Sequence, residues 1–332
     1  MINKNAKLSQ AIFTDNIEKK STRDGFGHGV VEAGKADQGV VVLCADLAES
    51  TRAEMFQKEF PERFIEMGVA EQNMAAVAAG MAVVGKIPFI ASYAVFNPGR
   101  NYEQIRTTIA LNNVPVKICG MHAGVSVGPD GATHQMLEDI GMMRMLPGMT
   151  VIVPGDSEEA RKAVVEAALT DGPVYIRFGR ANTPIFTTTK TPFQIGKALT
   201  LWNPPNGAKP QVAILSTGSL SYTALTAAHI LASDGVESIV LHVPTVKPLD
   251  EGTVLSAAKR AGRVITIEEH QIAGGFGSAV AEFLSECYPV PIKRLGVQDQ
   301  FGQSGSPEEL LTHYGLDAIH IEEAVRAFVR IQ

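Results

Sequence analysis

Short runs of β-branched and other apolar residues alternate along the chain with longer segments whose apolar residues recur at helical spacing. In the first half this pattern predicts strands over residues 39–44, 87–91, 114–119, 150–153 and 174–177. Between them it predicts helices over residues 22–34, 70–84, 100–112 and 157–170. Alternating strands and helices are typical of βα units around a mostly parallel sheet.

A second series of the same kind follows a lapse in the pattern. Residues 183–209 are rich in threonine and proline and lack periodicity, as expected of a connecting segment. Beyond it the pattern predicts strands over residues 211–216, 237–242, 263–268 and 291–295, and helices over residues 220–233, 251–259, 275–287 and 321–330. The predicted fold class is therefore α/β, with two consecutive domains, each a mostly parallel β-sheet flanked by helices. We place the domains at residues 1–188 and 211–332, with a linker over 189–210.

Composition narrows the class of protein. The chain has 332 residues, a net charge of −6 and no basic run, which argues against a nucleic acid or an anionic membrane as partner. No apolar run approaches the roughly 20 residues of a membrane span, and residues 1–20 lack the apolar core of a signal peptide. We therefore expect a cytoplasmic protein. Three cysteines without disulfide or zinc spacing are expected to be buried free thiols: Cys44, Cys119 and Cys287.

One carboxylate stands at the start of a predicted helix that otherwise consists of small and apolar residues. This residue is Glu71, in the segment 67–80. Burying an unpaired carboxylate costs several kcal/mol unless the group is neutral, so its presence needs a reason. It is either a structural acid in the first helical turn, or a partly protonated carboxylate that binds a ring nitrogen of a cofactor.

Aromatic residues and histidines follow two predicted strands of the same half. Tyr93 and Phe96 come after the strand 87–91, where such residues join the core or line a ligand pocket. His122, Asp130 and His134 lie on a glycine-rich loop after the strand 114–119. Such a loop indicates polar chemistry in a cleft or a metal site, although the spacing of the histidines fits no usual zinc pattern.

Taken together and in this order, these segments resemble the C-terminal portion of transketolase, a pyrimidine-binding domain followed by a small C-terminal domain. The resemblance covers essentially the whole chain. It implies thiamine diphosphate as cofactor, which supplies the nucleophilic carbon and electron sink. It also implies that Glu71 hydrogen-bonds the aminopyrimidine ring and favours its imino tautomer, that Tyr93 and Phe96 pack around this ring, and that Asp46 lies near the thiazolium half.

The resemblance further implies a site for sugar phosphates. His122 and His134 match histidines that contact substrate hydroxyls and the reacting oxygen, and that can move protons. Asp130 matches the acid that recognises a sugar hydroxyl. Three residues match positions that hold the distal phosphate: Arg23, Ser50 and Arg180. The implied reaction moves a two-carbon ketol unit between ketose and aldose phosphates.

Two departures from the family limit what this chain does alone. The family binds the diphosphate through a divalent ion, Mg²⁺ or Ca²⁺, on a Gly-Asp-Gly…Asn motif that this sequence lacks. The resemblance therefore implies one subunit of a split transketolase, with a partner subunit that holds the metal and with an α2β2 assembly. Residues 97–99 add one residue after Phe96 relative to the family, which leaves the role of Arg100 open.

Other interpretations stay open at this point. A β subunit of a 2-oxo acid dehydrogenase shares the two-domain plan, but usually has His-Ser-Gln where this chain has Thr133-His134-Gln135. The segment 268–277 resembles deoxyxylulose-phosphate synthase, and also many relatives. A non-catalytic scaffold subunit is disfavoured because the chain retains Glu71 and the loop histidines together. The donor and acceptor sugars do not follow from the sequence.

Overall fold

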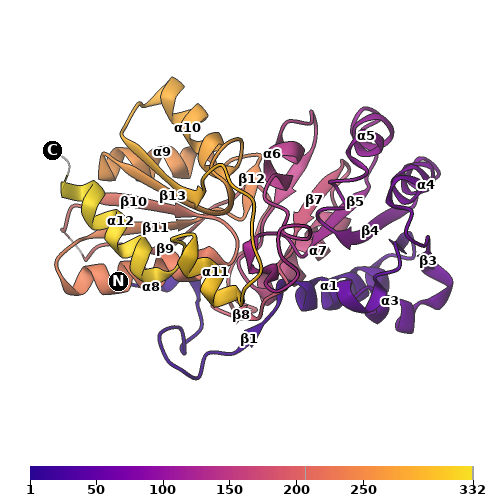
Figure 1. Cartoon of the computed structure of the whole chain (residues 1–332), viewed down its shortest axis with the longest axis horizontal. Helices are drawn as coiled ribbons and strands as arrows, with labels where there is room; N and C mark the ends of the chain where they lie inside the picture. The colour runs from indigo at the N-terminus through magenta and orange to yellow at the C-terminus, as the bar shows by residue number, and fades with distance from the viewer. Residues whose placement is uncertain (206, 331–332) are drawn as a thin grey trace.

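The chain forms two α/β units that lie side by side, as the computed structural model in Figure 1 shows for residues 1–205 and 207–330. The first unit contains a seven-stranded sheet with the order β12-β6-β7-β5-β4-β2-β3. Its strands are β2 Val40–Cys44, β3 Phe64–Glu66, β4 Ile87–Tyr93, β5 Lys117–Met121, β6 Thr150–Ile152, β7 Val174–Arg177 and β12 Thr245–Lys247. Its helices are α1 Thr22–Ala36, α2 Ala48–Thr51, α3 Glu54–Glu59, α4 Glu71–Val83, α5 Tyr102–Gln104, α6 Asp139–Arg144 and α7 Ser157–Ala168.

The second unit contains a five-stranded sheet with the order β14-β13-β10-β11-β9. Its strands are β9 Leu199–Trp202, β10 Val212–Ser216, β11 Ser238–His242, β13 Val264–Gln271 and β14 Ile292–Val297. Its helices are α8 Leu220–Ser233, α9 Glu251–Ala261, α10 Phe276–Cys287, α11 Pro307–His313 and α12 Ala318–Arg330. In both sheets all pairings are parallel except those of β12 with β6 and of β9 with β11. The predicted fold class is confirmed.

One of the two antiparallel edge strands, β12, ties the units together. β9 lies inside the segment 189–210, where we expected a linker, and it pairs with β11 of the second sheet. β12 follows β11 in the chain but crosses back to pair with β6 of the first sheet. The N-terminus also lies on the second unit, since the Asn3 amide donates to the Leu201 carbonyl. The proposed domain limits stay a prediction, and segments near them cross between the units.

The two units contact each other through apolar and polar side chains. One continuous hydrophobic cluster includes Met143 of α6 and Val153 from the first unit, and Val246 and Phe276 from the part of the chain beyond β11. Beside it, the buried His242 ring lies between the Glu159 carboxylate at Nε2 and the Ser221 hydroxyl at Nδ1, each 2.6 Å away. We infer that the two units are fixed against each other, which matters for residues that one unit contributes to the site of the other.

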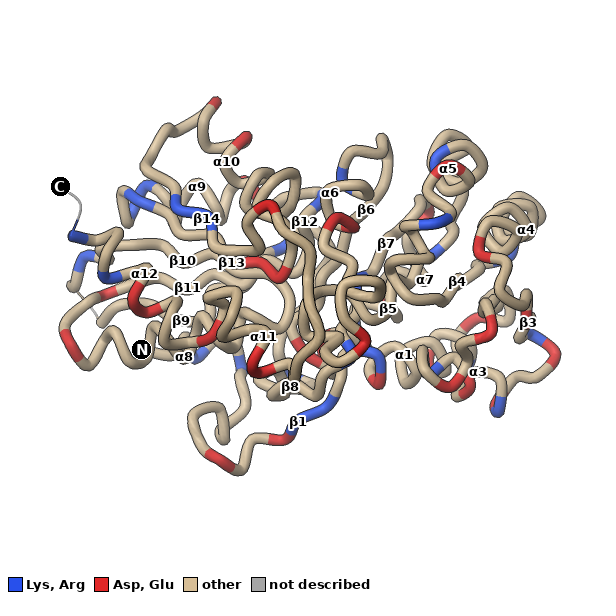
Figure 2. The backbone as a smooth tube through the Cα atoms, in the orientation of Figure 1, with Lys and Arg blue, Asp and Glu red and all other residues tan. Residues whose placement is uncertain are grey.

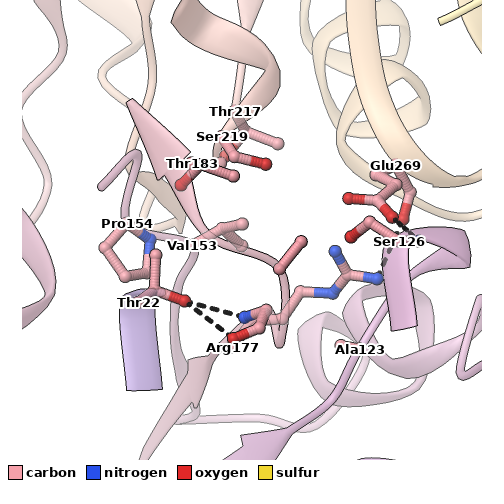
Figure 3. A pocket seen from close by; sticks show the side chains of 13 residues that line it. Thr22, Ala123, Ser126, Val153, Pro154, Arg177, Thr183, Thr217, Ser219 and Glu269 are labelled. Atoms are coloured by element: carbon pink, nitrogen blue, oxygen red, sulfur yellow. Dashed lines mark hydrogen bonds between the residues drawn. The ribbon is translucent and has the colours of Figure 1, made fainter. Parts of the chain in front are cut away.

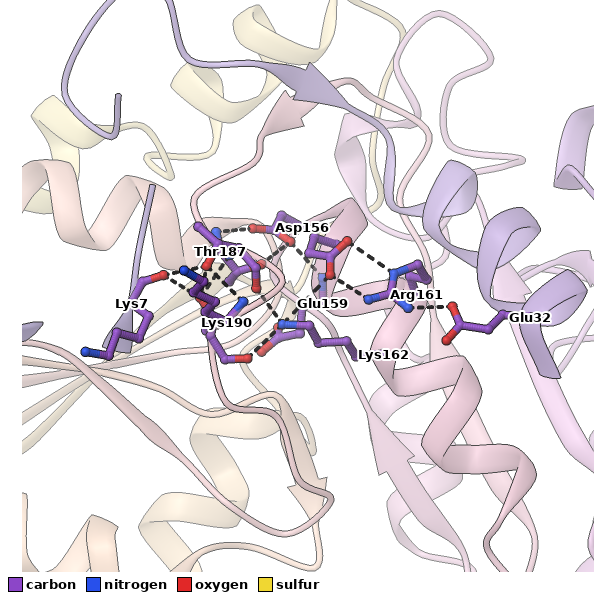
Figure 4. Close-up of polar contacts among 11 residues, drawn as sticks. Lys7, Glu32, Asp156, Glu159, Arg161, Lys162, Thr187 and Lys190 are labelled. Carbon is purple, nitrogen blue, oxygen red and sulfur yellow. Dashed lines mark hydrogen bonds and ion pairs between the residues drawn. The ribbon is translucent and has the colours of Figure 1, made fainter. Parts of the chain in front are cut away.

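Polar contacts also hold the segment 187–191, where the chain leaves the first unit, against helix α7 and against the N-terminal segment around Lys7 (Figure 4). The helix predicted over residues 157–170 begins at Ser157, and the Asp156 carboxylate caps it by accepting from the Glu159 amide at 2.9 Å. The same carboxylate accepts from the Thr187 amide and hydroxyl. One cap therefore stabilises both the helix and the chain that leaves the first unit.

The helix predicted over residues 100–112 is wrong in detail. It begins as the single turn α5 and continues as a π-helix over Ile105–Ala110. The hydroxyls of Thr107 and Thr108 donate to the carbonyls of Glu103 and Gln104 four residues earlier. Such back-bonding competes with the regular helical pattern and distorts helices.

The expectation for the cysteines is correct for two of the three. All three are free thiols, and Cys44 and Cys119 lie inside buried strands. Cys287 is exposed, at the last residue of α10. Within the ranges 1–205 and 207–330, no helix is long and apolar enough to cross a membrane.

Candidate active site

Glu71 is the first residue of helix α4, and its side chain is only 2% exposed. Its Oε2 accepts a hydrogen bond of 2.9 Å from Nη1 of Arg100. The expected apolar setting is therefore incomplete, since a guanidinium group contacts the carboxylate. Glu71 Oε1 has no hydrogen-bond partner within the described ranges. One oxygen of a buried carboxylate thus stays available to a ligand.

The aromatic residues after β4 connect Glu71 to the histidine loop. The Arg100 guanidinium lies 4.6 Å from the Phe96 ring centroid, and the Phe96 ring stacks at 6.1 Å on Tyr93. The Tyr93 ring is 4.0 Å from the His122 ring, and His134 lies edge-on to both aromatic rings. The structure therefore brings Glu71, both aromatic residues and both histidines into one contiguous set.

His122 is held in an unusual environment. Its backbone has a φ of 54°, its side chain is 2% exposed, and its Nδ1 has no partner within the described ranges. Burial, and next the positive charges of Arg23 and Arg180, lower the pKa of His122 to about 3. The ring is therefore neutral at physiological pH, so His122 offers a hydrogen bond from a neutral imidazole and does not act as a resting acid.

Arginines gather at the same end of the first sheet. Nη1 of Arg23 donates to the Ser50 carbonyl at 2.7 Å, while its Nε is buried without a partner within the described ranges. Nη1 of Arg180 donates to the Val127 carbonyl and lies 3.6 Å from Asp130. Burial, and next the neighbouring Arg52, lower the pKa of Arg23. Such an excess of positive charge favours an anionic ligand.

Two predicted site residues lie differently from the expectation. Ser50 contacts Arg23 through its backbone carbonyl, and no hydrogen bond within the described ranges joins its hydroxyl to this cluster. Asp46 is an exposed residue just past β2, and its amide donates to Glu66. No hydrogen bond, ion pair or ring contact within the described ranges joins Asp46 to the other candidates.

Glu269 of the second unit contacts the loop that carries the two histidines. Oε1 of Glu269, on β13, accepts a 2.6 Å hydrogen bond from the Ser126 amide. Gly124 has a φ of 90°, and a Cβ there would approach Glu269 Oε1 to 2.3 Å, so this close contact requires glycine. Figure 3 shows Glu269, Ser126 and Arg177 around a cavity of about 30 Å³. A space of this size holds a water molecule and not a sugar phosphate, so the cavity is not the substrate site.

Several residues of the site were missed by sequence reasoning. Arg52 at the end of α2 pairs with Asp24 at 2.7 Å and adds positive charge near Arg23. Asn101 donates to the Glu71 carbonyl at 3.1 Å and is fully buried. Nothing in the sequence distinguished these side chains from ordinary surface or helical residues. Arg100 carried a signal, because the sequence pattern predicted a departure from the family just before it, over residues 97–99.

The chain matches two family models. One is described as transketolase, pyrimidine binding domain, and matches residues 18–185. The other is described as transketolase, C-terminal domain, and matches residues 205–321. Together they cover nearly the same two segments that carry the two sheets.

Individual relatives agree with these matches. A Methanocaldococcus jannaschii protein, named provisionally as a transketolase C-terminal section, is 42% identical over 309 residues, which are 92% of this chain and 95% of that protein. A 6-deoxy-6-sulfo-D-fructose transketolase subunit of Clostridium sp. strain MSTE9 is 40% identical over 95% of both chains. A solved structure, described as a split gene transketolase in an inactive β4 tetramer, is 43% identical with a TM-score of 0.85 and covers 92% of this chain and 97% of that one. This chain therefore belongs to the transketolase family, and it contains the pyrimidine-binding and C-terminal domains of that family.

Proposed function

We propose that the chain is the C-terminal subunit of a split, thiamine-diphosphate-dependent transketolase that transfers a two-carbon ketol unit between ketose and aldose phosphates. The observation that carries the proposal is the contiguous set of Glu71, Phe96, Tyr93, His122 and His134. It combines a buried carboxylate, an aromatic wall and two imidazoles, which suits an aromatic ring bound next to a reacting polar substrate.

The residues present fit the pyrimidine half of the cofactor. When bound, thiamine diphosphate supplies a carbon nucleophile and electron sink. Glu71 would hold or release a proton at a ring nitrogen through Oε1, the oxygen that Arg100 leaves free. Phe96 and Tyr93 would fix the plane of the ring by stacking.

The polar end of the set fits the substrate. His122 and His134 would bind hydroxyl and carbonyl oxygens, and Asp130 would bind a sugar hydroxyl at the rim. Arg23 and Arg180 would hold a terminal phosphate, since Arg23 forms no ion pair within the described ranges and Arg180 forms only a partly exposed one, 3.6 Å from Asp130. A relative that acts on a sulfonated sugar supports an anionic end group as the common feature of the substrates.

The proposal includes a partner subunit. We propose that it carries the diphosphate and the divalent metal, Mg²⁺ or Ca²⁺, because the sequence lacks the Gly-Asp-Gly…Asn motif. No group of three or more potential metal ligands of the His, Cys, Asp or Glu type is found within the described ranges.

Helix α4 supports association with other chains. Its only charged residue is Glu71, so Figure 2 shows no further charge along it, and beyond the exposed Gln72 and Asn73 its outer face is apolar. Ala76, Val77 and Gly80 are exposed on that face, and a Cβ at Gly80 would meet no atom within 4 Å. A surface of this kind suits close contact with another subunit. We propose an α2β2 assembly, and we retain cytoplasm as the proposed location.

The experiment that tests the proposal is reconstitution. The chain is mixed with a candidate N-terminal subunit, Mg²⁺ and thiamine diphosphate, and ketol transfer between sugar phosphates is followed by product chromatography. We expect activity from the mixture and none from either subunit alone. Full activity of this chain alone, or no ketol transfer with any N-terminal transketolase subunit encoded beside it, would contradict the proposal.

A dehydrogenase control belongs in the same experiment. A 2-oxo acid dehydrogenase β subunit would act on a 2-oxo acid and pass the product to a lipoyl carrier. Activity with pyruvate and a lipoyl domain, in place of sugar phosphates, would favour that alternative. The same assay excludes a scaffold subunit if any turnover depends on Glu71.

A further inference from the structure

Arg100 makes the closest contact to the Glu71 carboxylate, yet the proposed function gives it no role. Its Nη1 donates to Glu71 Oε2 at 2.9 Å, and its guanidinium lies 4.6 Å from the Phe96 ring centroid. The two side chains differ strongly in burial, since Arg100 is 47% exposed and Glu71 only 2%. A mobile surface arginine would turn to solvent, so its position against a buried acid needs an explanation.

The backbone around Arg100 is built to place it there. The Gly99 amide donates to the Ala94 carbonyl, and a Cβ at Gly99 would lie 2.1 Å from the Val95 carbonyl oxygen. No larger residue fits without moving this turn. The Arg100 amide then donates to the Phe96 carbonyl at 3.1 Å. The turn that the extra residue creates therefore fixes Arg100 next to the aromatic wall.

A pair of buried asparagines locks the same turn to the Glu71 backbone. Asn101 donates to the Glu71 carbonyl at 3.1 Å and to Asn97 Oδ1 at 3.0 Å. Asn97 donates in turn to the carbonyls of Ile90 on β4 and Cys119 on β5. Both asparagines are fully buried. The start of α4 and the segment bearing Arg100 are thus held by the two central strands of the site.

We propose that Arg100 is a positioning residue for the cofactor step, which holds Glu71 by one oxygen and directs the other towards the cofactor ring. The proposal rests on the proposed function, because it requires a cofactor ring at Glu71. It assigns the extra turn 97–99 a purpose, namely to supply a cation that the carboxylate would otherwise lack.

The physical consequence is a difference between cofactor activation and cofactor affinity. With Arg100 present, one Glu71 oxygen is fixed and the other can face the ring, so exchange at the thiazolium carbon of the bound cofactor is fast. Without that hydrogen bond the carboxylate is less well oriented and the exchange slows. A purely structural arginine would change stability or affinity and leave the exchange rate of the bound cofactor unchanged.

The test uses the enzyme assembled with its partner subunit, Mg²⁺ and thiamine diphosphate. Three variants are compared with the wild type: Arg100→Gln, Arg100→Lys and the control Arg106→Gln, at an exposed arginine of the same helical segment. Hydrogen–deuterium exchange at the thiazolium carbon is measured by quenched-flow NMR from pH 5 to 9, which is a range chosen around the operating pH. Calorimetry gives the cofactor affinity of each variant.

For Arg100→Gln we expect the exchange rate of the bound cofactor to fall by about 10-fold, because a charge-assisted hydrogen bond to Glu71 is lost. Arg100→Lys keeps a cationic donor and should restore most of the wild-type rate, while Arg106→Gln should not change it. An unchanged exchange rate in Arg100→Gln, with wild-type exchange intact, overturns the role of Arg100 alone. Absence of cofactor binding and exchange in the assembled wild type overturns the proposed function and this inference with it.

Discussion

Replacing Glu71 by glutamine separates a cofactor-activating carboxylate from a structural one. The amide fills the same volume and still accepts a hydrogen bond from Arg100, but it cannot exchange a proton with a ring nitrogen. The variant loses stability only because the charge-assisted hydrogen bond to Arg100 becomes a neutral one. This change costs about 1 kcal/mol of folding free energy at most, since water screens the half-exposed Arg100. The catalytic loss is that of a positioned acid–base group, at least ~100-fold in kcat, or about 2.7 kcal/mol.

The assay compares the two losses in one protein. Thermal unfolding and light scattering should show a Glu71→Gln variant that folds and assembles nearly as the wild type does. Exchange at the thiazolium carbon and kcat should both fall by ~100-fold or more. Glu62→Gln, at a surface acid that is 70% exposed, serves as the matched control and should change neither. Wild-type exchange in the Glu71 variant would refute the reasoning and remove Glu71 from the mechanism.

Three further outcomes are expected. Arg23→Ala or Arg180→Ala should raise KM for phosphorylated sugars by about 10- to 150-fold, from lost bonds of about 1.5–3 kcal/mol, and affect non-phosphorylated analogues much less; equal losses on both substrates would show that the arginines are structural. Val77→Lys, on the exposed face of α4, should lower the mass of the assembly in light scattering without unfolding the chain, and an unchanged mass would remove this face from the interface. Burial and the neighbouring arginines lower the pKa of His122 from 6.5 to about 3 in the folded chain. Between these pH values the unfolded chain binds more protons than the folded chain. The folded state is therefore fully stable above pH 6.5 and loses stability as pH falls towards 3. The free energy of unfolding should decrease by up to ~1.4 kcal/mol for each pH unit in this window. In His122→Asn the free energy of unfolding should depend less on pH. The same pH dependence in wild type and variant, measured by denaturation, would contradict this role of His122.

Local sequence patterns were sufficient for most of the fold. Helix α8 and strand β7 begin and end at the predicted residues, since each has a clear period and a clear end. Helix α11 was missed although Ser306, Pro307 and Glu309 form a capping box with proline in the first turn, a signal that a search for helix starts would find. Strands β9 and β12 are short and pair at sheet edges, so their existence depends on partners far away in the chain.

In the candidate site, too, some features follow from local sequence and others from distant contacts. The sequence by itself determined which residue types stand at the ends of β4 and β5 and at the start of α4, because these positions follow from local periodicity and from resemblance to a family. Only the tertiary structure decided their charges and partners: that Arg100, 29 residues away, contacts Glu71, and that Glu269, 143 residues away, supports the histidine loop. The same holds for the neutral state of His122, which depends on burial and on arginines from three separate segments. The physical reason is that secondary structure depends on neighbours within a few residues, whereas burial and electrostatics depend on distances in space, which the order of residues along the chain does not contain.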